Sequence, residues 1–360
     1  VFASWASRIP DVKQFLHLNN GQLGSILLAI PMGQVLMMGF SGLLVSKLGS
    51  KKMLILSEVF YALVLFALGC SNTVFHLILS LVAFGMMANL MNIATNTQAC
   101  LVEKLYGRNI MSSFHGLWSL GGFAGGIVGT LFANLLLPIE VHFTAILLLG
   151  ILIIVCAFRF LVNDEQAKAE EEDVPKFSFR TIDPVLFLLG LMGFAGMFCE
   201  GTVYDWSGVY FSTVVKPDDA FIRAGYVAGM GAMTLGRFLA DGFVTKYGAS
   251  KVLKMCGLLI LGGLLLAVIF PYLITATLGF LLVGFGISSS VPICYSIAGK
   301  LGTIKASIAI TIVSSISFFG FLIGPPVIGW LSEATNLRVA LGMAACLGLM
   351  IAYIAKKVVS

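Results

Sequence analysis

Long apolar stretches alternate with short polar connections along almost the whole chain of 360 residues. Eleven apolar runs of about 20 residues are present, a length that spans the ~30 Å hydrocarbon core of a bilayer as a helix. These runs are centred near residues 33, 62, 86, 122, 150, 197, 232, 261, 285, 318 and 346. A helix satisfies its own backbone hydrogen bonds in lipid, so the pattern predicts an all-α membrane protein with many spans.

Composition and charge placement support this class and set an orientation. The chain is 59% hydrophobic and 11% charged, whereas soluble domains carry about 25% charged residues. Sixteen lysines and arginines fall in one alternating set of connections, beginning with residues 46–52, and five fall in the other set. The positive-inside rule places the first set in the cytoplasm. Since this placement explains the net charge of +5, we expect no nucleic-acid partner.

An internal repeat relates the two halves of the chain. Pairs of like residues recur at one offset of 199 positions: Lys47 and Lys246, Gly85 and Gly284, and Gly125 and Gly324. The offset predicts two six-helix halves, residues 1–162 and 183–360, joined by a cytoplasmic linker over residues 163–182. It also places the start of the first helix about 16 residues before Val1. We therefore expect that helix to be incomplete at its N-terminus in this chain.

A loop and five further motifs carry a family resemblance. Residues 42–52 read GLLVSKLGSKK, which resembles the loop signature of the major facilitator superfamily, with Ser46 in place of the family's acid. The motifs FASWASRIP, HGLWSLGGFAGG, EGTVYDW, GRF and FLIGPPVIG are similar to the YbjJ-like branch of bacterial inner-membrane transporters, distantly related to fucose permease. The resemblance implies a 12-helix fold, cytoplasmic N- and C-termini in the full-length protein, and secondary transport by alternating access in the bacterial inner membrane.

Three asparagines lie on one face of the helix expected near residue 86: Asn89, Asn92 and Asn96. A carboxamide both donates and accepts hydrogen bonds, so this stripe suits a hydroxylated or zwitterionic substrate. Hydrogen bonding between helices is the alternative. Gln34 and Tyr295 are further candidate substrate-binding residues.

The next helix places His115 and Trp118 on one face. An imidazole titrates near neutral pH, which makes His115 a candidate for proton coupling, and a role as a hydrogen-bonded core residue is equally open. Trp118 offers a surface on which a sugar or a ring of the substrate would stack.

Two acids, Glu200 and Asp205, interrupt the apolar run that begins at Pro184. Ionisable side chains at bilayer depth are costly and mark a pathway or a pair. Glu200 lies about 24 Å along the helix from Pro184 and shares a face with Tyr204, a candidate substrate contact. One interpretation is that Glu200 binds the coupling proton. A second is that Arg8 pairs with one of the two acids and closes a gate, to which Asp205 also belongs. A third is a purely structural hydrogen bond.

Arg237 and Asp241 are spaced for contact on one helix. They are interpreted as a local ion pair or as a gate against the opposite half.

The leading functional hypothesis is a proton-coupled transporter of a small polar solute, and the alternative is a proton-driven exporter of drugs or metabolites. An enzyme or a non-transporting sensor is disfavoured, because the four histidines (17, 76, 115 and 142) are scattered and none has a cysteine or acid at ligand spacing. We predict no catalytic residue, metal or cofactor. The expected partners are protons, the substrate and the lipid bilayer, and we expect a monomer.

Overall fold

The computed structural model describes residues 1–106, 111–163, 184–301 and 306–358, and within these ranges the regular structure is helical. Among the described residues, ten helical segments are long and apolar enough to cross a membrane. The all-α membrane fold expected from the hydrophobic pattern is therefore confirmed. Of the predicted linker over residues 163–182, all but Asn163 lies outside the described residues, so the domain boundaries stay a prediction.

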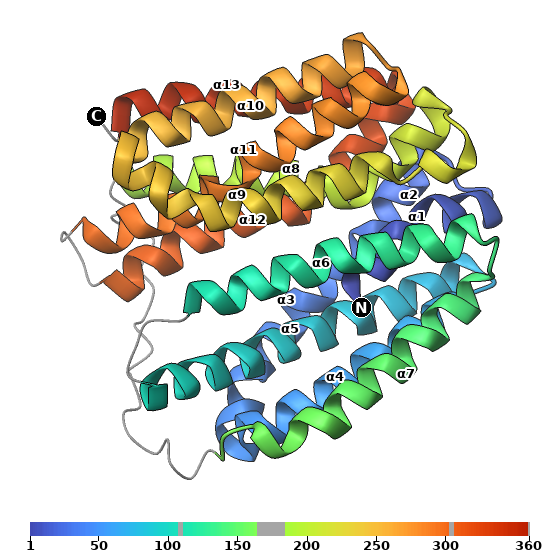
Figure 1. The fold of residues 1–360 in the computed structure, drawn as a ribbon, viewed down its shortest axis with the longest axis vertical. Coiled ribbons are helices and arrows are strands. Elements are labelled where there is room, and N and C mark those ends of the chain that lie inside the picture. Colours follow the sequence, from blue (N-terminus) through green and yellow to red (C-terminus); the bar gives the residue numbers. More distant parts are fainter. Residues whose placement is uncertain (107–110, 164–183, 302–305, 359–360) are drawn as a thin grey trace.

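The first half of the chain forms seven α-helices (Figure 1). They are α1 (Phe2–Phe15), α2 (Asn20–Leu27), α3 (Ala29–Leu48), α4 (Ser50–Gly69), α5 (Val74–Tyr106), α6 (Met111–Asn134) and α7 (Ile139–Ala157), followed by the short turn η1 (Phe158–Phe160). The helices α2 and α3 are consecutive and together make one span, Asn20–Leu48. Asn19 caps α2 through a reciprocal pair of hydrogen bonds with Gln22, which satisfies amide groups at the start of that helix.

The second half repeats this order. It contains α8 (Pro184–Tyr210), which continues into the π-helical turn η4 (Phe211–Val215), then the short turn η5 (Asp219–Phe221). The remaining helices are α9 (Ala224–Tyr247), α10 (Ala249–Ile269), α11 (Leu273–Lys300), α12 (Ala306–Ala334) and α13 (Leu337–Val358).

Backbone features recur between the halves at the offset of 199 residues that the sequence shows. Gly49, between α3 and α4, has a φ of 89°, and Gly248, between α9 and α10, has a φ of 80°. A positive φ costs glycine little, so the same residue turns the chain at both basic loops. His17 and Lys216, also 199 apart, have φ values of 53° and 49°. The repeat in the sequence is thus a repeat of backbone conformation.

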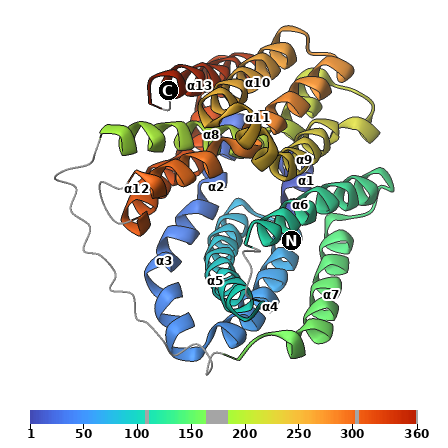
Figure 2. The same cartoon turned by 60° about the vertical axis from the view of Figure 1, so that its left-hand side comes forward.

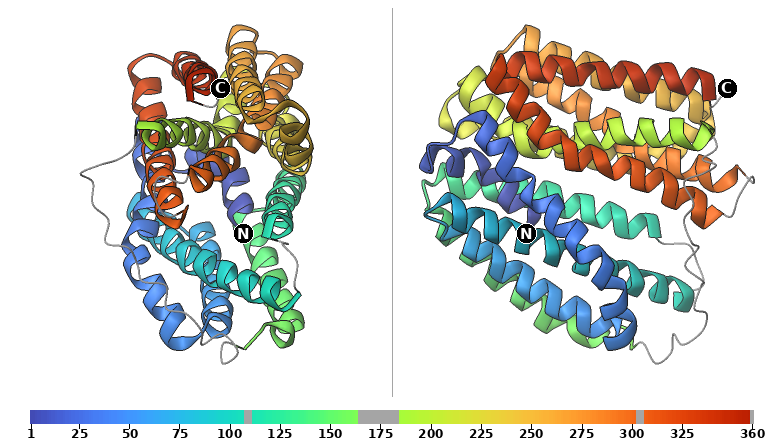
Figure 3. Two further views of the ribbon diagram at one scale, coloured as in Figure 1. Left: turned by 90° about the vertical axis from the view of Figure 1, so that its left-hand side faces the viewer. Right: turned by 180° about the vertical axis from the view of Figure 1, so that it is seen from behind.

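The two halves lie side by side and converge at one end (Figures 2 and 3). Between them α1 contacts α8, α2 contacts α12, and α6 contacts α9. At the convergent end the backbones of α2 and α12 meet at Gly24 and Gly329, where an added Cβ on Gly24 would lie 2.9 Å from the Gly329 Cα. Toward the opposite end, which carries the basic loops of residues 46–52 and 246–251, the ribbons of the two halves diverge. We call these the convergent end and the basic end.

Candidate functional site

Glu200 lies in the middle of α8 and is 6% exposed. Its Oε1 accepts a hydrogen bond from the hydroxyl of Tyr204, one turn further along, at 3.3 Å. The same oxygen accepts from Nη2 of Arg237, on α9, at 3.2 Å. An acid at bilayer depth thus has both a cation and a neutral donor, which offset the cost of burying its charge.

Arg237 extends this contact into the first half of the chain. Its Nη1 donates a 2.5 Å hydrogen bond to the Ser119 hydroxyl on α6, and its guanidinium carbon lies 5.8 Å from the ring centre of Trp118. The Trp118 side chain is itself half exposed. We call Glu200, Tyr204, Arg237, Ser119 and Trp118 the central junction, because it joins α8 and α9 to α6.

The central junction revises the interpretation of Arg237. Its described partners are Glu200 and Ser119, and the bond to Ser119 reaches the opposite half. The gate role stays a prediction. The side chain of Asp241, the expected local partner, lies outside the described part of the structure. The side chain of His115, one turn before Ser119, also lies outside it.

The expected pair between Arg8 and an acid of α8 is not formed, because Arg8 has other partners. Its Nη1 pairs with Asp11 at 3.0 Å, its Nε donates to Nδ1 of His142 at 3.2 Å, and its Nη2 donates to the Leu137 carbonyl at 3.0 Å. Asp205 is 9% exposed, and no ion pair joins it to Arg8 among the described residues.

Asp11 has a second arginine partner, Arg223, which lies just before α9. Arg223 also donates from Nε to the Ser7 carbonyl at 2.7 Å. Burial lowers the pKa of this guanidinium, and the carboxylate of Asp11 opposes the shift. We call Arg8, Asp11, His142 and Arg223 the end cluster, since they close the convergent end between α1, α7 and α9. Asp11 and Arg223 are functional candidates that the sequence analysis missed, although Arg8 and Asp11 have the spacing of an ion pair on one helix.

The asparagine stripe on α5 is engaged in contacts of its own. The Oδ1 of Asn89 accepts a 2.7 Å hydrogen bond from Ser41 on α3, and Nδ2 of Asn96 donates to Oδ1 of Asn92 at 3.0 Å. Gln34 on α3 and Tyr295 on α11 are half-buried. The structure thus brings Glu200, Tyr204 and Trp118 together around Arg237. Among the described contacts, no hydrogen bond joins this group to the asparagines.

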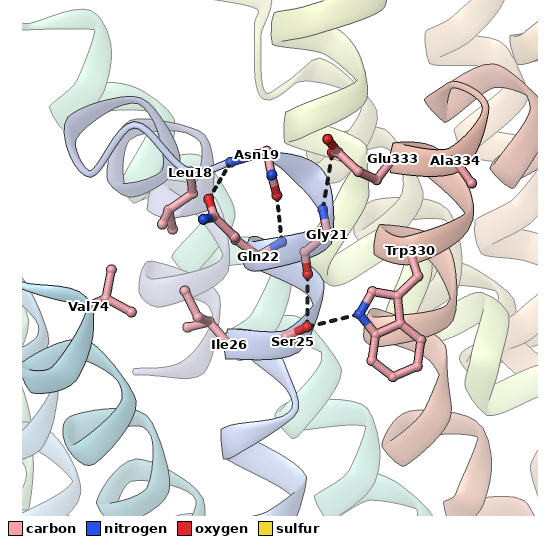
Figure 4. A pocket seen from close by; sticks show the side chains of 10 residues that line it. All are labelled: Leu18, Asn19, Gly21, Gln22, Ser25, Ile26, Val74, Trp330, Glu333 and Ala334. Carbon is pink, nitrogen blue, oxygen red and sulfur yellow. Dashed lines mark hydrogen bonds between the residues drawn. The ribbon is translucent and has the colours of Figure 1, made fainter.

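A separate cleft of about 660 Å³ opens at the convergent end between α2, α12 and the start of α5 (Figure 4). At its wall the indole N–H of Trp330 donates to the Ser25 hydroxyl at 2.9 Å. None of the candidate site residues from the sequence analysis lines this cleft. Among the described residues, no group of three or more His, Cys, Asp or Glu side chains has the geometry of a metal site.

The paired halves of apolar helices define a polytopic membrane protein. Its family and its transporter-named relatives indicate a transporter rather than an enzyme. The sequence pattern of the Major Facilitator Superfamily matches residues 3–305, and the chain belongs to that family. It is 35% identical to an uncharacterized MFS-type transporter of Yersinia pestis over 99% of this chain and 91% of that protein. It is 30% identical to membrane protein MosC of Rhizobium meliloti, over 98% of this chain and 85% of MosC.

Two solved structures share the fold. A mutant of the nucleoside transporter NupG superposes with a TM-score of 0.77 at 14% identity, covering 100% of this chain and 97% of NupG. A bacterial homolog of the human lysosomal transporter Spinster, inward-facing and unoccupied, superposes with a TM-score of 0.75 at 12% identity, covering 99% and 94% of the two chains. At these identities the likeness concerns the fold.

Proposed function

We propose that this protein moves a small polar solute by alternating access and couples that movement to protons at the central junction. The contact between Glu200 and Arg237 carries the proposal. It unites a proton acceptor with a fixed cation at the place where α8 and α9 meet α6. Protonation of Glu200 would weaken its hold on Arg237, and Arg237 contacts both halves. A proton bound at this point therefore changes a contact between the two moving parts.

The arrangement of the halves supports a specific orientation. The convergent end is closed by the end cluster and by the approach of Gly24 to Gly329. The opposite end bears the lysine-rich loops and faces the cytoplasm in our proposal, following the positive-inside rule. We propose a location in the bacterial inner membrane, with cytoplasmic N- and C-termini in the full-length protein, and a conformation closed to the outside. His115 stays a second candidate for proton coupling, and Asn89, Asn92, Asn96, Gln34 and Tyr295 stay candidates for substrate contact.

A flux assay with a trapped pH dye tests the proposal. Substrates are first found by thermal shift with sugars, amino acids, nucleosides and common drugs at two pH values, because a ligand stabilises the state that binds it. A solute that stabilises the protein is then added outside proteoliposomes containing the protein alone. Acidification of the lumen indicates symport, and alkalinisation indicates the antiport expected of an exporter.

The decisive variant is Glu200→Gln, which keeps the shape of the side chain and removes its proton exchange. We expect proton movement to fall by about tenfold or more while downhill solute exchange continues, since general acid–base groups contribute effects of about 10²-fold or more. Glu140→Gln is the control, because Glu140 is an exposed carboxylate at the start of α7. Proton movement at the wild-type rate in Glu200→Gln would refute coupling at this acid.

A further inference from the structure

We infer that Arg237 recognises a carboxylate on the transported solute, which replaces Glu200 as the partner of the guanidinium when Glu200 takes up a proton. This inference rests on the proposed function and specifies its substrate class: small organic acids with a polar remainder. It follows from the position of Arg237, its bonding and the charge balance of the central junction.

Arg237 is placed where a solute would cross between the halves. It lies more than two turns from either end of α9 and contacts α8 on one side and α6 on the other. Its side chain is 20% exposed, whereas that of Glu200 is 8% exposed. The cation is therefore the more accessible member of the pair. An incoming anion would meet Arg237 before it met the acid.

The single bond between the two side chains leaves N–H groups of the guanidinium able to donate to a carboxylate of the solute. Only Oε1 of Glu200 contacts Arg237, through Nη2, although a guanidinium and a carboxylate are able to form two parallel hydrogen bonds. Oε1 also accepts from Tyr204, which would hold the acid after Arg237 leaves it. Beside the guanidinium, the half-exposed ring of Trp118 offers a face on which a sugar or ring in the remainder of the solute would stack.

Charge balance then couples the protonation of Glu200 to the binding of the solute's carboxylate. Removing one partner from a buried ion pair leaves the other charge uncompensated, which is strongly unfavourable. Among the described side chains Glu200 is the carboxylate that pairs with Arg237, so protonation of Glu200 alone would leave the guanidinium without that partner. A carboxylate from the solute restores neutrality, whereas a neutral solute does not. Proton and organic acid are thus expected to bind together, each raising the affinity for the other.

The test uses the purified full chain and three matched pairs of probes: lactate and lactamide, glutamate and glutamine, and glucuronate and glucose. Thermal shift is measured for each at about pH 6 and about pH 8, which lie on either side of neutral pH. We expect at least one acid to raise the melting temperature more than its neutral partner does, with a larger effect at the lower pH.

Variants assign that effect to the junction. Arg237→Gln should weaken binding of the active acid by about tenfold or more, and Arg237→Lys should restore part of it by keeping the charge. Glu200→Gln mimics the protonated acid, so it should bind the organic acid equally well at both pH values. Arg338→Gln is the matched control, because Arg338 bonds only to the carbonyls of Val268 and Ile269 among its described contacts.

The outcomes separate this inference from the proposed function. Neutral partners that bind as well as the acids, no response to any acid, or full acid binding in Arg237→Gln would each overturn carboxylate recognition. In those cases proton-driven flux of a neutral solute would leave the proposed function standing. Conversely, acid binding that requires Arg237 without any proton movement in proteoliposomes would reject proton coupling and retain the recognition.

Discussion

The end cluster and the central junction both place arginine against an acid where the halves meet, but they differ in charge balance and in access. In the end cluster, Asp11 is shared by Arg8 and Arg223, whose side chains are 5% and 4% exposed. Among the described side chains of the central junction, one acid faces one arginine, and that arginine is 20% exposed. Two buried arginines bonded to one acid form a contact that we expect to be stable. A single balanced pair beside a half-exposed Trp118 makes a contact that a proton or a ligand is able to change.

The comparison implies that the convergent end is held shut by packing and charge together, independently of the central junction. The packing part is the approach of α2 to α12, and the charge part is the end cluster. One substitution removes the packing part alone, and another removes the charge part alone. A third weakens the bond between the central junction and α6.

The largest effect is expected from Gly24→Leu. A Cβ at this position would lie 2.7 Å from the Pro325 carbonyl oxygen and 2.9 Å from the Gly329 Cα, so a larger side chain forces α2 away from α12. Overpacking of this kind costs about 1–3 kcal/mol, which is enough to shift the population toward a state open at the convergent end. A thiol introduced at buried Ser332 should then react faster with a membrane-impermeant maleimide.

Gly39→Leu is the matched control for that measurement, because nothing lies within 4 Å of a Cβ added at Gly39. Both variants are compared after the exposed cysteines Cys70, Cys100, Cys156 and Cys346 are replaced by serine. Equal labelling rates in the two variants would contradict a seam closed by the approach of Gly24 to Gly329.

A smaller effect is expected from Asp11→Asn, which removes the shared acid of the end cluster. Arg8 and Arg223 are then left buried without the carboxylate that both contact, and Asp219 remains as an acid that acts on Arg223. Breaking a buried pair costs about 3–5 kcal/mol, and Asp11 is 31% exposed, so we expect about 2 kcal/mol after allowing for solvent screening. The readout is the apparent melting temperature of the purified protein.

Asp218→Asn serves as its control. Asp218 is exposed and makes no side-chain hydrogen bond to cap η5, and surface substitutions change stability by no more than about 0.5 kcal/mol. If Asp11→Asn melts no lower than Asp218→Asn, the end cluster contributes nothing to closing this end.

The pattern of the sequence predicted the features that depend on local chemistry. Apolar run lengths gave the spans, and Gly49 and Gly248 fell at turns with positive φ. Glu200 and Tyr204 were placed on one face because they are one helical turn apart, and they are bonded in the structure. These relations hold within one helix or one loop, where periodicity determines the outcome.

Partners on different helices were not predictable in the same way. Arg237 was interpreted as a partner of Asp241 or as a gate against the opposite half. In the structure it pairs with Glu200, 37 residues earlier, and the side chain of Asp241 lies outside the described residues. Arg8 was assigned to the acids of α8, but Asp11 is only three residues away and His142 reaches it from α7. The rotation of each helix about its axis decides such contacts, and that rotation is set by packing of the whole bundle, including close approaches such as Gly85 to the backbone of α3.

The smallest effect is expected from Ser119→Ala, which tests whether the bond from the central junction to α6 holds the halves or only adjusts them. The substitution removes the hydroxyl that accepts from Nη1 of Arg237 and leaves the pair with Glu200 in place. A single hydrogen bond contributes about 1 kcal/mol net, which corresponds to about a fivefold change in an equilibrium constant. We therefore expect solute-driven proton movement to change by up to about fivefold, with the melting temperature nearly unchanged.

Ser57→Ala is the control, since Ser57 is equally buried on α4 and bonds within its own helix. A larger loss of stability in Ser119→Ala than in Asp11→Asn would reverse the comparison, because the central junction would then be the contact that holds the halves together.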